Sequence, residues 1–134
     1  MTSIQHLNPE GLPRNRAFTQ AIAVDGPHRV IYVGGQNAVD SAGTILGKGD
    51  LGTQAQQTFR NLKLVLEAAG ARLEHVVKWT IYLVQGHPLA PAFEVFQREW
   101  GARPNPPTIS VVYVAGLANP DFLVEIDAVA VVAH

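Results

Sequence analysis

The sequence predicts one α/β domain of the α+β type, with elements in the order β-β-α-β-α-β-β. Three observations support this class. A chain of 134 residues is long enough for one hydrophobic core but short for two. Five segments are rich in β-branched and aromatic residues, and two others carry apolar residues at helical spacing. We therefore expect residues 1–134 to form a single domain.

The first quarter of the chain predicts a hairpin after an irregular start. Residues 1–15 contain two prolines and a glycine and are expected to form an irregular arm. Residues 17–24 and 29–33 read as strands on either side of a turn at residues 25–28, so we expect them to pair with each other. Residues 37–50 hold three glycines and predict a loop.

Two amphipathic helices follow. Apolar residues recur every three or four positions from Leu51 to Ala69, with Asp50 or Thr53 able to cap the start and Gly70 placed to end the helix. A shorter apolar stripe predicts a second helix over residues 89–100.

The remaining strands are expected at residues 76–84, 108–114 and 122–132. Alternation places Trp79 and Ile81 on one face of the first of these, and Lys78, Thr80 and Tyr82 on the other.

The last strand carries the most unusual chemistry, because Glu125 and Asp127 share a face that is otherwise apolar. A charged group there must be paired, hydrogen-bonded or open to water. Two interpretations stay open at this point: acids of an edge strand that face solvent, or a carboxylate at the lip of a pocket that acts as a base.

Composition indicates self-association. Only 16% of residues are charged and 47% are hydrophobic, and two helices cover only one face of a sheet. A second copy packed on the other face is the economical solution. The net charge of −1 argues against nucleic acid or an anionic membrane as a partner. With no signal-peptide features, no long apolar run and no cysteine, we expect a cytoplasmic protein without membrane spans or disulfides.

Common catalytic motifs are missing. Gly43–Gly49 is one residue short of a phosphate loop and has glycine where Ser or Thr should bind magnesium. The five histidines lack metal-ligand spacing, and no serine stands in a nucleophile turn. We expect no metal and no cofactor. Gly34 and Gly35, which end a strand, predict a bulge or a close backbone approach.

From about residue 16 to 132, the chain resembles the RidA/YjgF family, also known as endoribonuclease L-PSP. The stretches that carry the resemblance are Arg16–Ala21, Val33–Gln36, Asn61–Gly70, Val76–Lys78, Arg103-Pro104 and Val124–Val131. The resemblance implies a chorismate-mutase-like fold with a mixed sheet and two helices on one face. It also implies a homotrimer with small-molecule pockets between subunits, in which 2-imino or enamino acids are hydrolysed to 2-keto acids and ammonia.

The same resemblance implies roles for five residues. Glu125 would orient the attacking water, and Phe18, Gly34, Gly35 and Pro106 would line the ligand site. Phe18 stands where the family has tyrosine, and Gly34 where it has serine. The arginine that grips the substrate carboxylate falls at Pro106 or a close neighbour, and no Lys or Arg follows Arg103.

The sequence therefore supports three hypotheses. The first is a homotrimeric hydrolase or deaminase of imines or related electrophilic metabolites, with Glu125 catalytic and the substrate uncharged or anchored differently. The second is a trimer of the same fold that binds a metabolite without chemistry. Endoribonuclease activity ranks last, because Arg14 with Arg16 and Arg60 with Lys63 are too sparse for a basic stripe.

Overall fold

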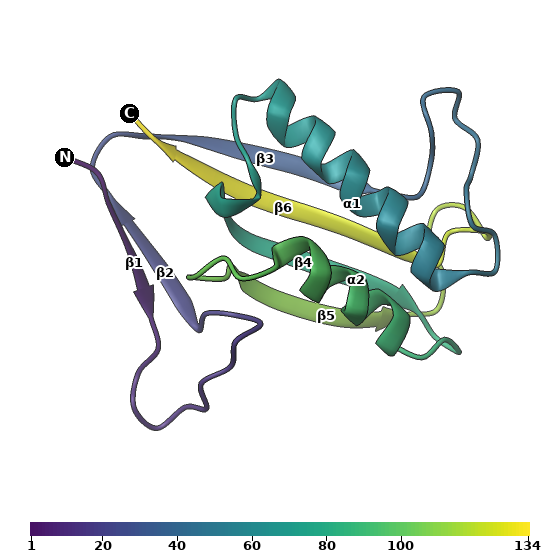
Figure 1. Cartoon of the computed structure of the whole chain (residues 1–134), viewed down its shortest axis with the longest axis horizontal. Coiled ribbons are helices and arrows are strands. Elements are labelled where there is room, and N and C mark those ends of the chain that lie inside the picture. Colours follow the sequence, from purple (N-terminus) through teal and green to yellow (C-terminus); the bar gives the residue numbers. More distant parts are fainter.

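The computed structural model describes all 134 residues and is organised around a mixed four-stranded sheet. Its strands lie in the order β3 (His28–Gln36), β6 (Val124–Ala133), β4 (Val76–Val84) and β5 (Thr108–Val114). Strand β6 is antiparallel to both β3 and β4, whereas β4 and β5 are parallel. Helices α1 (Leu51–Ala68) and α2 (Ala90–Trp100) lie on one face of this sheet (Figure 1). The predicted fold class is confirmed.

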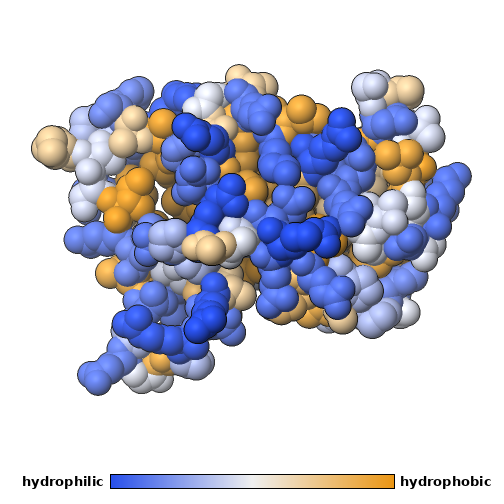
Figure 2. Space-filling view, in the orientation of Figure 1, coloured by the Kyte–Doolittle hydropathy of each residue, from blue (hydrophilic) through white to orange (hydrophobic).

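The core lies between these helices and the sheet. The predicted stripe of α1 is buried, and Phe59 stands edge-on to Trp79 of β4 and to Phe96 of α2. Such edge-to-face pairs add to the free energy gained by burying the rings. A short 3₁₀ turn, η1 (Leu73–His75), leads from α1 into β4. The outward sides of the helices are mainly hydrophilic (Figure 2).

Both ends of α1 follow from local chemistry. The Asp50 carboxylate accepts hydrogen bonds from the backbone N–H and the hydroxyl of Thr53, at 3.1 and 2.9 Å. The backbone hydrogen bond is the main reason that the pKa of Asp50 is lowered, since it favours the charged form. After the helix, Gly70 has a φ of +76°, a conformation that suits glycine because it has no Cβ.

The N-terminal segment differs from the prediction. Strand β1 (Ser3–Leu7) lies inside the arm that was expected to be irregular, and it pairs with β2 (Ala21–Asp25). The predicted pairing of β2 with the following strand is wrong. Pro27 between them has no N–H, and its carbonyl accepts hydrogen bonds from Thr2 and His134 instead of closing a hairpin. The β1–β2 ribbon therefore projects from the four-stranded sheet (Figure 1).

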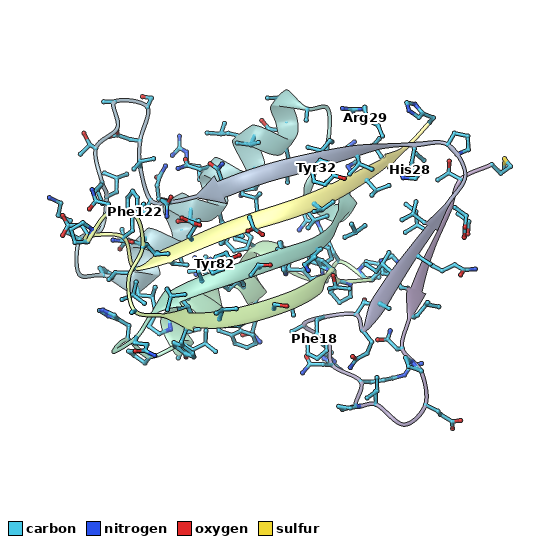
Figure 3. All side chains as sticks on the ribbon, turned by 180° about the vertical axis from the view of Figure 1, so that it is seen from behind. Phe18, His28, Arg29, Tyr32, Tyr82 and Phe122 are labelled. Carbon is cyan, nitrogen blue, oxygen red and sulfur yellow. The ribbon has the colours of Figure 1, made fainter.

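The sheet has one face covered by helices and one open face. Side chains at alternate positions of β4 and β6 are buried beneath the helices, as predicted from the alternation. Tyr32 of β3 and Tyr82 of β4 lie on the open face (Figure 3), and Tyr32 is 81% exposed. No helix of the structure is both long and apolar enough to cross a membrane.

Candidate functional site

Glu125 lies half-buried on the open face, near the start of β6. Its Oε1 accepts a hydrogen bond of 3.3 Å from Asn37 Nδ2, which also donates to the Val124 carbonyl at 3.3 Å. This is the only hydrogen bond to the Glu125 side chain in the structure. The other carboxylate oxygen lies over the backbone of Gly35, so close that a Cβ there would stand 2.6 Å from it. One oxygen is thus held while the other has no donor.

Gly35 is part of an irregularity in the sheet. The register of β3 against β6 shifts between Val33 and Gln36, as the glycine pair predicted. Gly34, the adjacent glycine, faces open space, because an added Cβ would meet nothing within 4 Å. The two glycines therefore have different surroundings: Gly35 makes room for the carboxylate, and Gly34 does not.

Helix α1 fixes the loop that carries Asn37. Asn61 Nδ2 donates to the carbonyls of Asn37 and Val39, both at 2.8 Å. Gln57 Nε2 donates to Asn61 Oδ1 at 2.9 Å and to the Val39 carbonyl at 3.3 Å. These contacts form a continuous chain from the helix to Glu125. Sequence reasoning missed Asn37, and the polar Gln57 and Asn61 four residues apart on the helix were the available signal.

A second polar pair lies beside Glu125. Tyr82 is the β4 partner of Glu125 in the sheet register, and its hydroxyl donates to Asp127 at 3.2 Å. The pKa of Tyr82 is raised, first by the charge of Asp127 and to a smaller extent by burial and by Glu125. Asp127 therefore has a partner within the chain.

Two predicted ligand residues lie elsewhere in the chain. Phe18 and Pro106 are near each other, because Thr19 bonds through its hydroxyl to the Pro106 carbonyl at 2.5 Å and through its N–H to Pro107 at 3.1 Å. The contact between Thr19 and the prolines lies just before Thr108, the first residue of β5. Glu125 instead lies level with Val112 of β5, because Tyr82 of β4 is the register partner of both. Four residues of strand span about 13 Å. Figure 3 shows Phe18 at one end of the sheet and Phe122 at the other.

The basic residues considered as carboxylate anchors are also dispersed. Arg103 donates to the carbonyls of Glu99 and Trp100, both at 2.9 Å, and is therefore engaged. Lys78 is on the same face as Glu125 but four positions along β4 from Tyr82. Arg16 lines a cavity on the other side of the sheet, together with Phe18. In a single chain, none of these is placed next to Glu125.

The structure groups no three His, Asp or Glu side chains in a way that could hold a metal ion. The polar site residues are instead carboxylates, amides and a phenol. This set can accept and donate protons and can orient a water molecule.

Comparison with known proteins identifies relatives over nearly the whole chain. Residues 12–132 match the model of the family described as Endoribonuclease L-PSP. A RutC family protein of Synechocystis is 39% identical over 115 residues, covering 85% of each chain. The rat 2-iminobutanoate/2-iminopropanoate deaminase is 33% identical over 115 residues, covering 86% of this chain and 80% of the rat protein.

Solved structures of the Rid family share the fold. The Rid family protein YyfB of Yersinia pestis superposes with a TM-score of 0.84 at 32% identity, covering 96% of this chain and 98% of the other. Together with the structure of the Escherichia coli YjgF protein, this match shows that the fold is the chorismate-mutase-like α+β fold of YjgF and RidA.

Proposed function

This chain belongs to the RidA/YjgF (endoribonuclease L-PSP) family, and on that premise we propose that it hydrolyses reactive imines or enamines of small metabolites. The observation that supports this most directly is the Glu125 carboxylate. It is fixed by Asn37 on one oxygen, without a donor on the other, and half-exposed on the open face. A carboxylate in that state can accept a proton from water.

The proposed reaction needs only water and one carboxylate. Glu125 orients a water molecule and takes its proton as the oxygen adds to the imine carbon. Glu125 passes this proton to the imine nitrogen, which gives a carbinolamine. The carbinolamine hydroxyl then loses its proton to Glu125 as the carbonyl forms, and that proton is passed to the nitrogen, which leaves as ammonia. The rat relative is named for the deamination of 2-iminobutanoate and 2-iminopropanoate.

We further propose that the working form is a homotrimer with its sites between subunits. Tyr32, Val112 and Val129 leave apolar surface on the open face, and burying such surface favours association. A neighbouring subunit is also the simplest way to bring Phe18 and Pro106 to Glu125. Tyr32→Asp should lower the mass measured by light scattering. Leu64→Asp, 56% exposed on α1, should not.

The positions of the basic residues restrict the charge of the substrate. The position expected to hold the family arginine is Pro106 or a neighbour, and the sequence has no Lys or Arg beyond Arg103. We therefore propose substrates that are uncharged, or whose carboxylate is held by Arg16 or Lys78 of a neighbouring subunit. A carboxylate buried without a partner costs several kcal/mol of binding, on the order of 2–5.

The experiment is hydrolysis of a freshly generated 2-imino acid and of an uncharged imine, measured as ammonia release. Glu125→Gln should reduce either activity by at least about 100-fold. Asp127→Asn, on the same face of the same strand, is the matched control and should retain most of the activity. An unchanged rate in Glu125→Gln would contradict the assigned role.

A second candidate is metabolite binding without chemistry. It is favoured by Phe18 and Gly34, which lack the hydroxyls that the family has at those positions. In that case neither imine is hydrolysed, and a ligand at 100 times its Kd raises stability by about 2.7 kcal/mol in a thermal-shift assay. RNA cleavage still ranks last, because Lys63 is paired with Glu99 at 2.8 Å.

A further inference from the structure

A polar groove of about 360 Å³ lies between the outward sides of α1 and α2. Only one of its eight lining residues is hydrophobic, and none of them belongs to a strand. Leu46 contributes from the loop before α1, and all the others come from the two helices. The groove therefore belongs to the hydrophilic face of the molecule (Figure 2), and a ligand that fits it must be polar.

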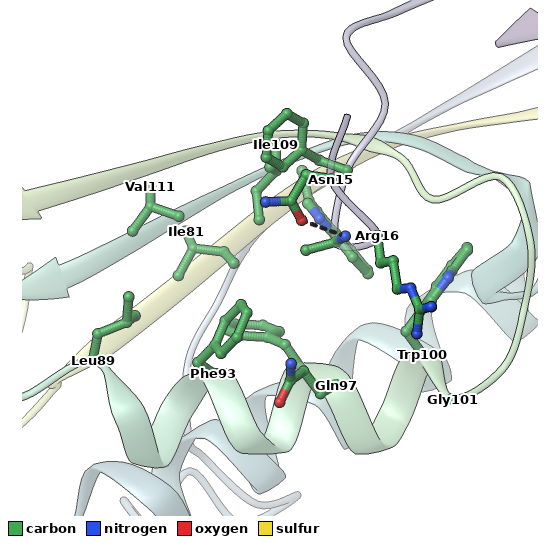
Figure 4. A pocket seen from close by; sticks show the side chains of 14 residues that line it. Asn15, Arg16, Ile81, Leu89, Phe93, Gln97, Trp100, Gly101, Ile109 and Val111 are labelled. Atoms are coloured by element: carbon green, nitrogen blue, oxygen red, sulfur yellow. Dashed lines mark hydrogen bonds between the residues drawn. The ribbon is translucent and has the colours of Figure 1, made fainter. Parts of the chain in front are cut away.

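This groove is distinct from the apolar cavity that Arg16 lines. Gln97 and Trp100 of α2 line that cavity (Figure 4), whereas Arg98 and Glu99 line the groove. The cavity and the groove share no lining residue. The candidate catalytic carboxylate lies on the open face of the sheet, so the sheet and the helices separate it from the groove.

One side of α1 forms most of the groove. Its polar side chains recur every three or four residues and therefore lie in one stripe along the helix, which consists of Thr53, Gln57, Arg60 and Lys63. Arg98 and Glu99 face this stripe from α2. Lys63 Nζ lies 2.8 Å from a carboxylate oxygen of Glu99, and this ion pair joins the two walls.

The charge in the groove is positive. Three of the ten Lys and Arg residues of the chain line it, against one carboxylate, so two positive charges are in excess. Glu99 is already paired with Lys63, and none of the three ion pairs in the structure involves Arg60 or Arg98. Both arginines are exposed, and neither guanidinium makes a hydrogen bond within the chain. Since the whole chain has a net charge of −1, this positive charge is local.

Two unpaired guanidinium groups at a polar groove suit a phosphate. The planar fork of arginine binds phosphate oxygens through paired hydrogen bonds. A phosphate monoester carries close to two negative charges at about pH 7.5, because its second pKa is about 6, and so matches the excess charge of the groove. The groove volume of about 360 Å³ lies within the range of small-molecule sites, about 300–1,000 Å³, which leaves room for a polar body beside the phosphate.

We propose that this groove binds a phosphate monoester of a small polar metabolite, of the kind represented by a sugar phosphate. Its phosphate binds Arg60 and Arg98. Its hydroxyls bind the Gln56 amide, which can donate and accept, and the Thr53 hydroxyl, which already donates to Asp50 and can accept. This second site goes beyond the proposed hydrolysis and does not depend on it.

Calorimetry with glucose 6-phosphate gives a direct test, in a phosphate-free buffer of low ionic strength, where exposed charges are weakly screened. Glucose is the control without the charge, and inorganic phosphate is the control without the polar body. We expect saturable binding of glucose 6-phosphate, weaker binding of inorganic phosphate and none of glucose. The proposal would be overturned by no saturable binding of glucose 6-phosphate up to millimolar concentration, or by an equal affinity for either control.

Variants then identify the site. Arg60→Gln and Arg98→Gln should each weaken binding of glucose 6-phosphate at least about tenfold. Both residues are exposed, so neither change should unfold the chain. Arg29→Gln is the matched control, because it removes the same charge from an exposed position of β3 outside the groove, and it should leave the Kd nearly unchanged.

Glu125→Gln should also leave the Kd of glucose 6-phosphate unchanged, since the two sites are on opposite sides of the molecule. Equal weakening by all three arginine variants would indicate non-specific attraction to positive charge and would refute the site. Loss of binding in Glu125→Gln would place the ligand on the open face and would refute it as well.

Discussion

Replacing Gly35 with alanine should displace the Glu125 carboxylate without unfolding the chain. The new Cβ would stand 2.6 Å from Oε2 and 2.7 Å from Cδ, whereas an ordinary contact begins at 3.4 Å, so the carboxylate must move by about 0.8 Å. That movement acts on a hydrogen bond from Asn37 that is already 3.3 Å long.

The effect on activity should exceed the effect on stability. A misplacement of about 1 Å can cost on the order of 100-fold in rate, so we expect kcat/KM to fall about 10- to 100-fold, which is about 1.4–2.7 kcal/mol. The displaced atoms end a flexible side chain, and Gly35 does not have a positive φ. The free energy of unfolding should therefore change by less than about 1 kcal/mol.

Gly34→Ala is the matched control, because its Cβ would meet nothing within 4 Å. The assays are imine hydrolysis, urea unfolding and the ¹³C shift of the Glu125 carboxyl, which needs no turnover. The shift should change in Gly35→Ala and not in Gly34→Ala. Equal rates and equal shifts in the two variants would refute the reasoning. In the Glu125→Gln variant, adding Gly35→Ala should lower kcat/KM little further, since the two changes act on one contact.

Three further predictions concern the residues around this site. Asn61→Ala removes one of the two donors from each of the Asn37 and Val39 carbonyls, which keep the Val39 N–H and Gln57 as donors, and should lower the free energy of unfolding by about 0.5–1.5 kcal/mol in urea. Gln54→Leu should lower the free energy of unfolding by more, about 1–3 kcal/mol, because buried Gln54 accepts from the Leu123 N–H at 2.8 Å in the loop before β6. Tyr82 has a raised pKa, so its contribution to stability is complete below about pH 10 and is lost as the pH rises through its folded-state pKa. Asp127→Asn should bring its titration, followed by NMR, back toward pH 10.

The sequence predicted the elements whose signal is local. The helix from Leu51 was defined by its apolar period, by Asp50 before it and by Gly70 after it, and the structure has all three features. The two faces of β4 and β6 were also predicted, because the alternation of side chains along a strand is a local signal. The pairing of β1 with β2 was not predicted. It depends on Pro27 after β2, which has no N–H to donate in a hairpin between β2 and β3.

The candidate site was likewise predicted only where its signal is local. Glu125 and Gly35 were both identified, but their contact depends on a bulge that brings two distant segments together. Asn37 has no local signal, because its orientation comes from Asn61 on a helix 24 residues away. Phe18 was assigned to the ligand site by resemblance. The structure places it beside Arg16 at the cavity, so its relation to Glu125 depends on contacts between subunits.

The charge of the substrate decides what the neighbouring subunit must supply. The Glu125 site has a fixed carboxylate but no cation beside it within one chain, so charged substrates need a residue from a neighbour. Arg16 is one candidate, because it lines the cavity on the other side of the sheet together with Phe18. Dissociating the oligomer with Tyr32→Asp should therefore reduce hydrolysis of a 2-imino acid more strongly than hydrolysis of an uncharged imine. An equal loss of both activities would contradict a role for the neighbour in holding the carboxylate.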